Sequence, residues 1–384
     1  MKRIKLLSIL LLAATLILSS CAQQDDIEYS APLQQNEERS SALEVLENFR
    51  KAISTNKEKP LSTIGICDIE NKYFTRINNH PIEVAYAQSR SNNEITTFTT
   101  ITFVLNGKNG YAIIGESNDT KEVLFYTENG EISDTSFIAP LKNYMTSHPY
   151  SFPSDLGPST SEDPVDTTLN TSHYFIPNIV KTTWGQGMPY NNHIPVCTDS
   201  TCSSYGRHKK VGCAGIAVGQ LIAKCGHYKG TLLPKGQLNF ALMTSTTTPT
   251  AQTENIIALF LAEVTQGLKT QYGCYGSSTS VSAIPRFLKA KGYDYTEISG
   301  LDIDLIKQNL EAGIPILATG QHPEGGHAWL ITGIFELSTD NYSFYCNWGW
   351  EGASDAWIHG NPYTVNKYLS FKDRLATSYI AGFN

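Results

Sequence analysis

Apolar and polar positions divide the start of the chain into stretches of different character. Residues 6–18 are apolar, residues 22–41 are mostly polar, and apolar residues then recur at the spacing of one helix face: Ala42, Val45, Leu46, Phe49 and Ile53. Ser41 and Glu44 stand at capping-box spacing at the start of this repeat. The pattern predicts a polar tether over residues 22–41 and an amphipathic helix that begins at Ser41.

Between residues 95 and 135 the pattern changes to short runs typical of β-strands, punctuated by Asn-Gly pairs at positions 106, 109 and 129. The predicted strands cover residues 100–105, 111–115 and 123–127. We therefore expect an α+β domain built largely of antiparallel hairpins.

Residues 151–172 are rich in Ser, Thr, Pro and Asp and contain almost nothing apolar to bury. This composition predicts an exposed linker. Exposed segments of this kind are where proteases cut.

From about residue 176 onward, helical patterns come first and strand patterns follow. Helices are predicted over residues 213–225, 256–268, 282–291 and 302–312, and strands over residues 314–319, 328–337, 342–348 and 356–358. The helix at 213–225 is apolar nearly all round, which indicates a buried central helix. A helical half followed by an antiparallel half leaves a cleft between them.

Composition narrows the possible partners. The chain has 384 residues, 41% hydrophobic content and a formal net charge of -7. Binding to nucleic acid needs clustered Lys and Arg, which an acidic chain does not favour. No apolar run after residue 20 is long enough to cross a bilayer.

The N-terminus resembles a bacterial lipoprotein signal. Lys2, Arg3 and Lys5 precede the apolar run, and Leu18-Ser19-Ser20-Cys21 is a small-residue cleavage site that ends in cysteine. Acylation of Cys21 would anchor the mature protein. The following Ala22 departs from the aspartate linked to inner-membrane retention, so we expect an outer-membrane lipoprotein of the cell envelope; the alternative is a plain secretory peptide.

A cysteine and a histidine are the main candidates for chemistry. Cys213 opens the buried helix, where backbone N–H groups and the helix dipole favour a thiolate. His327 stands at the start of a predicted strand, in Gly-Gly-His-Ala-Trp. An imidazole beside the thiolate would complete a nucleophile–base pair.

The other cysteines allow more than one interpretation. Cys197 and Cys202 flank a polar loop and predict a local disulfide, and a zinc site is the weaker alternative because no second ligand pair stands nearby. Cys225 and Cys346 are interpreted as buried apolar residues.

The sequence offers further secondary candidates. His208 lies among basic residues and is expected to be solvated, and the loop 320–326 is expected to form a mobile rim of the cleft. Gly215 and Gly219 lower helix propensity, which close packing against a neighbouring strand would explain.

Four ordered motifs resemble the streptopain-like cysteine peptidases, a papain-fold family: W-G-Q-G-M-P-Y-N, V-G-C-A-G-I-A-V-G-Q-L-I, G-G-H-A-W-L-I-T-G-I and Y-C-N-W-G-W-E-G-A-S-D-A-W-I. Upstream, F-V-L-N-G-K-N-G-Y-A-I-I-G-E-S and V-L-F-Y-T-E-N-G-E-I are similar to the family's propeptide. The resemblance implies that Cys213 is the nucleophile, His327 the general base and Gln186 the side-chain donor of the oxyanion hole.

The same resemblance places a tryptophan beside the histidine. Trp348 matches this position and would shield and hold the imidazole, while Asn347 is the alternative hydrogen-bond partner. Trp350 is interpreted as a core aromatic residue.

The sequence as a whole predicts a lipid-anchored cysteine endopeptidase made as a zymogen. Its predicted parts are a signal peptide (1–20), a tether and inhibitory propeptide (21–150), a processing linker (151–174) and a papain-like α+β catalytic domain (175–384). No metal or organic cofactor is expected; the partners are protein or peptide substrates, the chain's own propeptide and, through the lipid, the membrane. The alternatives are a cell-wall peptide amidase or transpeptidase with the same chemistry and a lipoprotein binding module with a relict cleft.

Overall fold

The structure is a computed structural model of the chain. It describes residues 33–54, 61–77, 80–84, 95–117, 120–131, 174–204, 206–228, 238–245, 248–298, 302–322, 325–338, 341–360 and 376–378. Among these residues, no helix combines the length and the apolar character needed to span a bilayer. The predicted signal peptide, Cys21 and nearly all of the linker lie outside the described residues.

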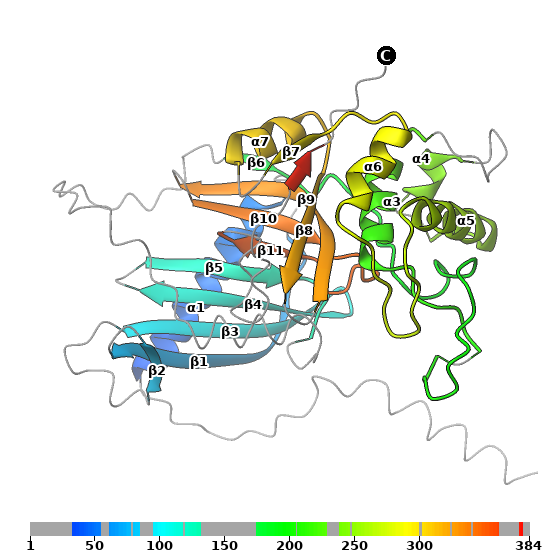
Figure 1. Cartoon of the computed structure of the whole chain (residues 1–384). Helices are drawn as coiled ribbons and strands as arrows, with labels where there is room; N and C mark the ends of the chain where they lie inside the picture. Colours follow the sequence, from blue (N-terminus) through cyan, green and yellow to red (C-terminus); the bar gives the residue numbers. More distant parts are fainter. Residues whose placement is uncertain are drawn as a thin grey trace, which may run out of the picture.

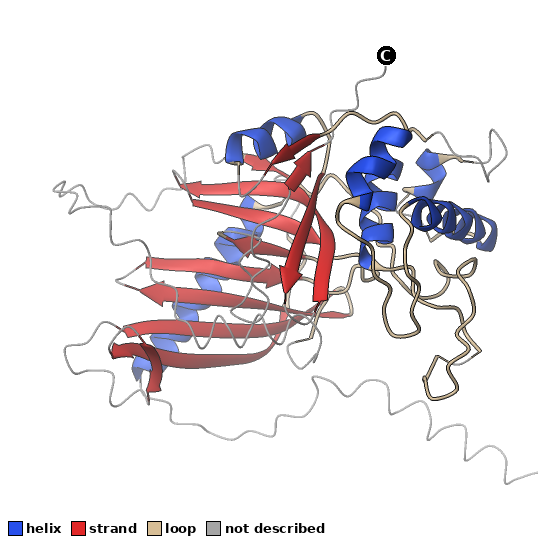
Figure 2. Ribbon diagram, in the orientation of Figure 1, coloured by secondary structure: helices blue, strands red, loops and turns tan. Residues whose placement is uncertain are grey.

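One antiparallel sheet runs through the molecule, with helices on its faces and beside one end (Figures 1 and 2). Its main path contains, in spatial order, β2 (His80–Val84), β1 (Gly65–Ile77), β3 (Ile95–Leu105), β4 (Lys108–Ser117), β5 (Thr120–Thr127), β11 (Ala356–His359), β10 (Asn341–Asn347), β9 (Gly325–Ser338), β8 (Ile316–His322), β12 (Ala376–Ser378) and β7 (Thr296–Ile298); β6 (Phe175–Ile176) pairs with β9. The helices are α1 (Leu33–Ala52), α3 (Cys213–Cys225), α4 (Phe240–Met243), α5 (Ala251–Gly267), α6 (Ala283–Ala290) and α7 (Ile303–Glu311). The α+β prediction is confirmed.

Helix α1 begins earlier than the sequence pattern predicts. Residues 33–41 were expected to form a tether, yet they are the first turns of the helix. They contain no Gly or Pro and include Leu, Gln, Glu and Arg, which propagate a helix well. The Ser41 hydroxyl therefore does not cap the helix; it accepts a hydrogen bond from Lys121 Nζ at 2.9 Å.

The N-terminal strands are longer and more numerous than predicted. Strands β1 and β2 were missed because their apolar residues are sparse, and β3, β4 and β5 extend beyond the predicted runs. Asn106 and Gly107 form the expected turn, both with positive φ. Asn109-Gly110 is instead strand, where a Cβ on Gly110 would lie 2.6 Å from the Phe103 ring, so this glycine makes room for an aromatic side chain.

The N-terminal strands continue directly into the C-terminal ones. Tyr126 and Phe125 of β5 pair with Trp357 and Ile358 of β11. Helix α1 lies across this junction, and its Phe49 packs edge-on against Phe335 of β9 at 5.9 Å. Residues 33–131 are therefore bound to the C-terminal part by strand pairing and by a shared apolar cluster.

The predicted helices and strands of the C-terminal part are present, with ends that differ by a few residues. The short elements α4, β6, β7 and β12 were not predicted, because so few residues carry little periodicity. Helices α3, α5 and α6 pack together in one cluster beside the sheet end that carries β8 and β9 (Figure 1).

Gly215 and Gly219 do mark a close approach, but the neighbour is helix α5 and not a strand. A Cβ on Gly215 would lie 2.4 Å from Thr265 Cγ2, and one on Gly219 would lie 2.5 Å from a Leu261 methyl group. The Thr265 side chain has little freedom to yield, since its hydroxyl bonds the Leu261 carbonyl at 2.8 Å and Tyr272 Oη at 2.8 Å.

Gly215→Ala should therefore destabilise the protein. The added methyl group overpacks the α3–α5 contact, and we expect the free energy of unfolding to fall by about 1–2 kcal/mol even though alanine is the better helix former. Urea denaturation followed by circular dichroism measures this change. Lys224→Ala, on the exposed face of the same helix, is the control that should change it little. An unfolding free energy for Gly215→Ala equal to or above the wild-type value would show that this contact does not require glycine.

Candidate active site

The backbone before Cys213 is shaped by a glycine. Gly212 is the N-cap of α3 and has φ 92°, a region that L side chains rarely adopt. A Cβ at this position would also lie 3.1 Å from Ser277 Cβ. The Ser277 hydroxyl donates to the Lys210 carbonyl at 2.6 Å, so the segment that leads into the helix is held from one side.

The thiol of Cys213 lies beside the strand that carries His327. Its sulfur accepts hydrogen bonds from the backbone N–H groups of Ala328, Ala214 and Cys213 itself. Ala328 directly follows His327 on β9. The fold thus brings together two residues that are 114 positions apart in the sequence, as the numbers 213 and 327 give.

Gln186 lies next to the same helix start. Its carbonyl accepts a hydrogen bond from the backbone N–H of Val211 at 3.1 Å, so the loop that carries Gln186 runs alongside the residues in front of Cys213. The Gln186 side chain is half-buried. This position is compatible with a side-chain donor beside the nucleophile.

Tryptophan rings surround the imidazole. The centroid of the His327 ring lies 5.1 Å from that of Trp350, 5.9 Å from that of Trp348 and 6.1 Å from that of Trp329, the last ring being nearly parallel to it. Trp350 packs at the edge of a core cluster, as a core aromatic does, but its ring is also the nearest of these to His327. Trp329 was not singled out from the sequence, although a residue two positions along a strand shares the face of His327.

The imidazole also has a backbone partner. A hydrogen bond with the backbone of Trp348 acts to raise the His327 pKa, which identifies the ring as donor and the Trp348 carbonyl as acceptor. The turn that supplies this carbonyl contains Gly349, with φ 72°, where a Cβ would lie 2.7 Å from Ile216 of α3. The turn therefore rests directly on helix α3, which begins at Cys213.

Asn347 supports this turn. Its side chain donates to the Thr182 carbonyl at 3.0 Å and accepts from Gln220 Nε2 at 3.0 Å and from the Gly349 N–H at 3.1 Å. The side-chain oxygen of Gln220, Oε1, in turn accepts a hydrogen bond from the Thr182 hydroxyl at 2.7 Å. Asn347 thus ties α3, the segment before Gln186 and the end of β10 together. Gln220 was not predicted; its polar side chain within an otherwise apolar helix was the available signal.

Burial disfavours the charged forms of both candidate residues in this form of the chain. Burial lowers the pKa of His327 to about 4, against the opposing effect of the Trp348 hydrogen bond. Burial also raises the pKa of the Cys213 thiol and outweighs the N–H groups that favour the thiolate. The sequence predicted a stabilised thiolate; here the loss of hydration exceeds the help from the helix N-terminus.

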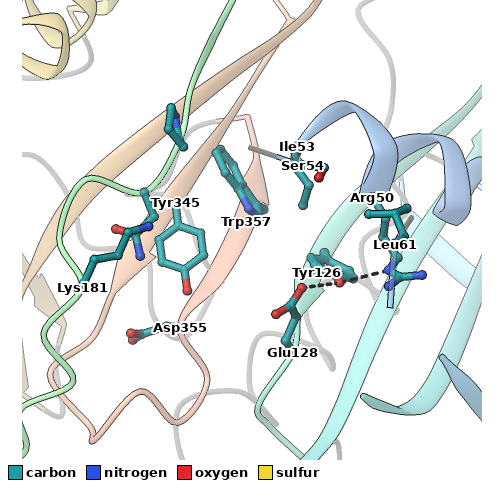
Figure 3. A pocket seen from close by; sticks show the side chains of 12 residues that line it. Arg50, Ile53, Ser54, Leu61, Tyr126, Glu128, Lys181, Tyr345, Asp355 and Trp357 are labelled. Carbon is teal, nitrogen blue, oxygen red and sulfur yellow. Dashed lines mark hydrogen bonds between the residues drawn. The ribbon is translucent and has the colours of Figure 1, made fainter. Parts of the chain in front are cut away.

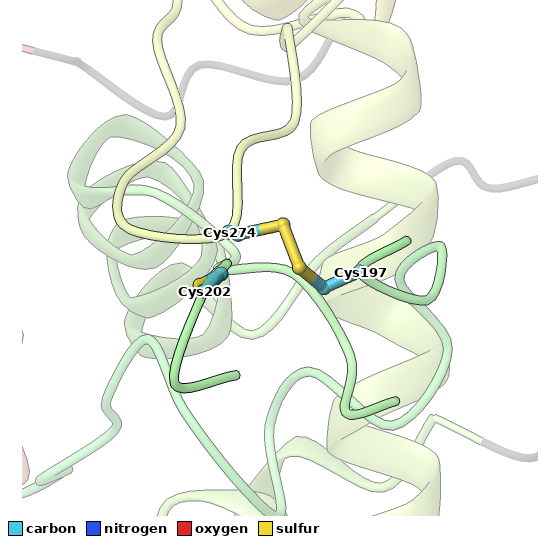
Figure 4. Close-up of side chains that lie close together, drawn as sticks. All are labelled: Cys197, Cys202 and Cys274. Atoms are coloured by element: carbon cyan, nitrogen blue, oxygen red, sulfur yellow. A yellow bond between two sulfur atoms is a disulfide. The ribbon is translucent and has the colours of Figure 1, made fainter. Parts of the chain in front are cut away.

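The predicted Cys197–Cys202 disulfide is wrong. Cys197 is bonded to Cys274, with a Cα–Cα distance of 5.5 Å, and the sulfur of Cys202 lies within 4.8 Å of both (Figure 4). The two cysteines are 77 positions apart in the sequence. By lowering the entropy of the unfolded chain, such a bridge stabilises the folded state by roughly 4 kcal/mol. It fixes the hairpin around Cys274, which contains Ser277, beside the entry to α3. Such a distant pairing depends on the fold and cannot be read from spacing.

Two secondary expectations also change. His208 is half-buried, and its Nδ1 forms a hydrogen bond with the Ile194 carbonyl, so it is not a solvated residue. Most of the expected rim 320–326 is strand, since β8 extends to His322 and β9 begins at Gly325. The side chain of His322 lies outside the described residues.

Comparison with known proteins agrees with this geometry. Residues 184–358 match the Peptidase C10 family, and this segment contains Gln186, Cys213, His327 and Trp348. A comparison with curated proteins finds no match. The chain is a cysteine-type peptidase, an enzyme of the hydrolase class. The match supports a streptopain-like cysteine peptidase, as the motifs of the sequence indicated.

The ionisation state of Cys213 can be tested by alkylation of the uncut full-length chain. Because burial holds the pKa of the Cys213 thiol above its ordinary value, the thiol stays mostly protonated at pH 7. The rate of iodoacetamide labelling at Cys213 should therefore rise about tenfold between pH 7 and pH 8. Peptide mass spectrometry separates Cys213 from Cys202, Cys225 and Cys346. A rate that is already constant between pH 5 and pH 7 would demonstrate a preformed thiolate–imidazolium pair and contradict this prediction.

Proposed function

We propose that the protein is an endopeptidase in which Cys213 is the nucleophile and His327 the general base, made as a zymogen and anchored by a lipid. The observation that carries the proposal is the hydrogen bond from the Ala328 N–H to the Cys213 sulfur, since it sets the thiol beside the residue that follows His327. A cysteine peptidase needs such a pair, and the family match supports peptide-bond hydrolysis as its use.

The residues suggest the following sequence of steps. His327 takes the proton of Cys213, and the thiolate attacks the peptide carbonyl carbon to form a tetrahedral intermediate. Its oxyanion accepts hydrogen bonds from the Cys213 backbone N–H and the Gln186 amide. The imidazolium then protonates the leaving amine as the C–N bond breaks, which leaves a thioester. Finally His327 takes a proton from water, which attacks the thioester and releases the acid and the free thiol.

The N-terminal part is positioned to control these steps. The Asn129 carbonyl accepts from the Ser354 N–H at 2.6 Å, and Asn129 Nδ2 donates to the Gly352 carbonyl at 3.0 Å. These contacts fall on the turn that follows Trp348 and Trp350. Together with the β5–β11 pairing they support a propeptide that is bound to the wall of the site.

The neutral state of the pair supports latency. Attack requires a thiolate, whereas burial in this form favours a neutral thiol and a neutral imidazole. We propose that cleavage between Ser151 and Tyr174 releases residues up to the linker and opens the site to water. Hydration then favours the charged pair.

The N-terminal signal gives the proposal its location. Acylated Cys21 would hold the precursor on the bacterial cell envelope as an outer-membrane lipoprotein, and cleavage in the linker would separate the catalytic part from the lipid. Protein or peptide substrates are the partners of the released enzyme, and no nucleic acid is involved. No metal or organic cofactor takes part in the proposed steps.

Gln186→Ala should lower kcat by roughly ten- to a thousand-fold and leave KM almost unchanged, because the amide stabilises charge that develops only in the transition state. Steady-state hydrolysis of a fluorogenic peptide by the active enzyme, normalised by active-site titration, measures both constants. Met188→Ala is the matched control: it lies in the same loop, its side chain is 66% exposed, and its kcat should stay at the wild-type value. A change confined to KM would make Gln186 a substrate-binding residue.

Full-length Cys213→Ala should accumulate uncut. A trace of active wild-type enzyme should then convert it to a fragment that begins between Ser151 and Tyr174, as N-terminal sequencing by mass spectrometry can establish. The separated N-terminal fragment, added back, should slow the active enzyme. If wild-type chain that is kept uncut by mutation of the linker hydrolyses peptide as fast as the cleaved form, the zymogen proposal is wrong and residues 33–131 have another task.

A further inference from the structure

A buried carboxylate holds the peptide unit that positions the catalytic histidine. Asp355 Oδ1 accepts a hydrogen bond from the backbone N–H of Trp348 at 2.9 Å, and Asp355 is 7% exposed. The two residues stand on either side of the turn that contains Trp350. The hydrogen bond therefore closes this turn from within.

The backbone of Trp348 is thereby engaged on both sides. Its N–H donates to Asp355, and its carbonyl accepts from the His327 ring. Hydrogen bonds in such a chain polarise and orient one another, most strongly where water is excluded. Asn347, the alternative partner predicted from the sequence, makes its three hydrogen bonds to Thr182, Gln220 and Gly349.

We propose that Asp355 is a positioning residue: it orients the Trp348 backbone so that its carbonyl fixes the His327 ring and favours the imidazolium during catalysis. The inference rests on the proposed role of His327 as general base. Asp355 itself need not touch the substrate. Its effect reaches the imidazole through the Trp348 backbone and through its negative charge.

The surroundings of Asp355 link this role to the N-terminal part. The Asp355 side chain lines a cavity of about 310 Å³ between the two parts of the chain (Figure 3). The ionisable side chains that face the cavity from the surrounding elements are Arg50 of α1, Tyr126 of β5, Glu128 after β5, Lys181 before α3 and Tyr345 of β10. The backbone carbonyl of Asp355 also accepts from the Thr127 hydroxyl at 2.8 Å. Residues of the N-terminal part thus line the same cavity as the carboxylate and bond the Asp355 backbone.

The surroundings of Asp355 disfavour its charged form in the uncut chain. Burial raises the pKa of Asp355 to about 7, and the Trp348 N–H opposes the shift. A carboxyl group with a raised pKa gains its charge only as the pH approaches neutrality. Release of the N-terminal part would hydrate the group and favour its charged form, which is the form that holds the Trp348 N–H most strongly.

The test compares variants of the active enzyme obtained from the full-length chain. Asp355→Asn keeps the size of the side chain and removes its charge. We expect kcat to fall roughly ten- to a hundred-fold with KM within about twofold, as for other groups that orient a reacting residue. Asp355→Glu keeps the charge and should recover part of the lost kcat.

A second readout separates positioning from general support of the fold. In the active enzyme the alkaline limb of the pH profile of kcat/KM reports loss of the imidazolium, so its upper pH limit is the imidazolium pKa. Loss of the Asp355 charge should move that limit to lower pH by about 0.5–1 unit, because a negative charge favours the imidazolium. Glu263→Gln is the control. Glu263 lies on α5, and its buried carboxylate pairs with Lys291 at 3.3 Å. This substitution should lower the melting temperature and leave both kcat and the pH limit unchanged.

Each failure has a different meaning. If Asp355→Asn keeps wild-type kcat and the wild-type pH limit, the inference about Asp355 is wrong, whatever happens to the melting temperature. If His327→Ala retains peptidase activity, the proposed function itself fails. A His327→Ala enzyme that is inactive beside a fully active Asp355→Asn enzyme would overturn the inference alone.

Discussion

The site depends on one buried hydrogen-bond network centred on Gln220. This side chain donates to Asn347 at the end of β10 and accepts from Thr182, which precedes the loop of Gln186. Since Gln220 also belongs to the helix that begins with Cys213, the network fixes three segments that are far apart in the sequence. A buried amide left without partners costs about 1–3 kcal/mol, so the arrangement in which all three segments meet is strongly preferred. The apolar packing of α3 against α5 then makes this frame rigid.

The N-terminal part acts on the same frame by extending its sheet. Strand β5 adds to β11, and the turn at Asn129 bonds residues 352–354, next to the turn of Trp348 and Trp350. The control that we propose for this part works mainly through hydration of the site. Burial disfavours the charged forms of Cys213, His327 and Asp355 together. These are the charges that the proposed reaction needs, so a propeptide that adds to this burial would disfavour all of them at once.

Local patterns in the sequence predicted the elements but not the contacts between them. The Cys213 helix, the Asn106-Gly107 turn and the strands of the C-terminal part follow from periodicity and turn chemistry, which act over a few residues. Ser41 shows the limit of such signals, because a capping sequence loses to residues 33–41 that continue the helix. The pairing of Cys197 with Cys274, and the packing of Gly215 on helix α5 rather than on a strand, depend on how distant segments meet. The position of Cys213 at a helix start and of His327 at a strand start led to these two residues, and the resemblance of the motifs led to Gln186. Gln220 and Asp355 have no local signal beyond a polar residue in an apolar setting.

Under the proposed mechanism, release of the N-terminal part and ionisation of Cys213 and His327 affect each other. If removal of the cover favours the thiolate–imidazolium pair, then any condition that favours the pair must weaken binding of the cover by the same factor. The Trp348 backbone is where the two effects meet, since it bonds His327 on one side and Asp355 on the other. Three tryptophan rings also pack around His327. The ionic state of the imidazole is therefore set first by its own burial and then by the carbonyl of the turn behind it. The residues that follow this turn are the ones that the N-terminal part contacts through Asn129.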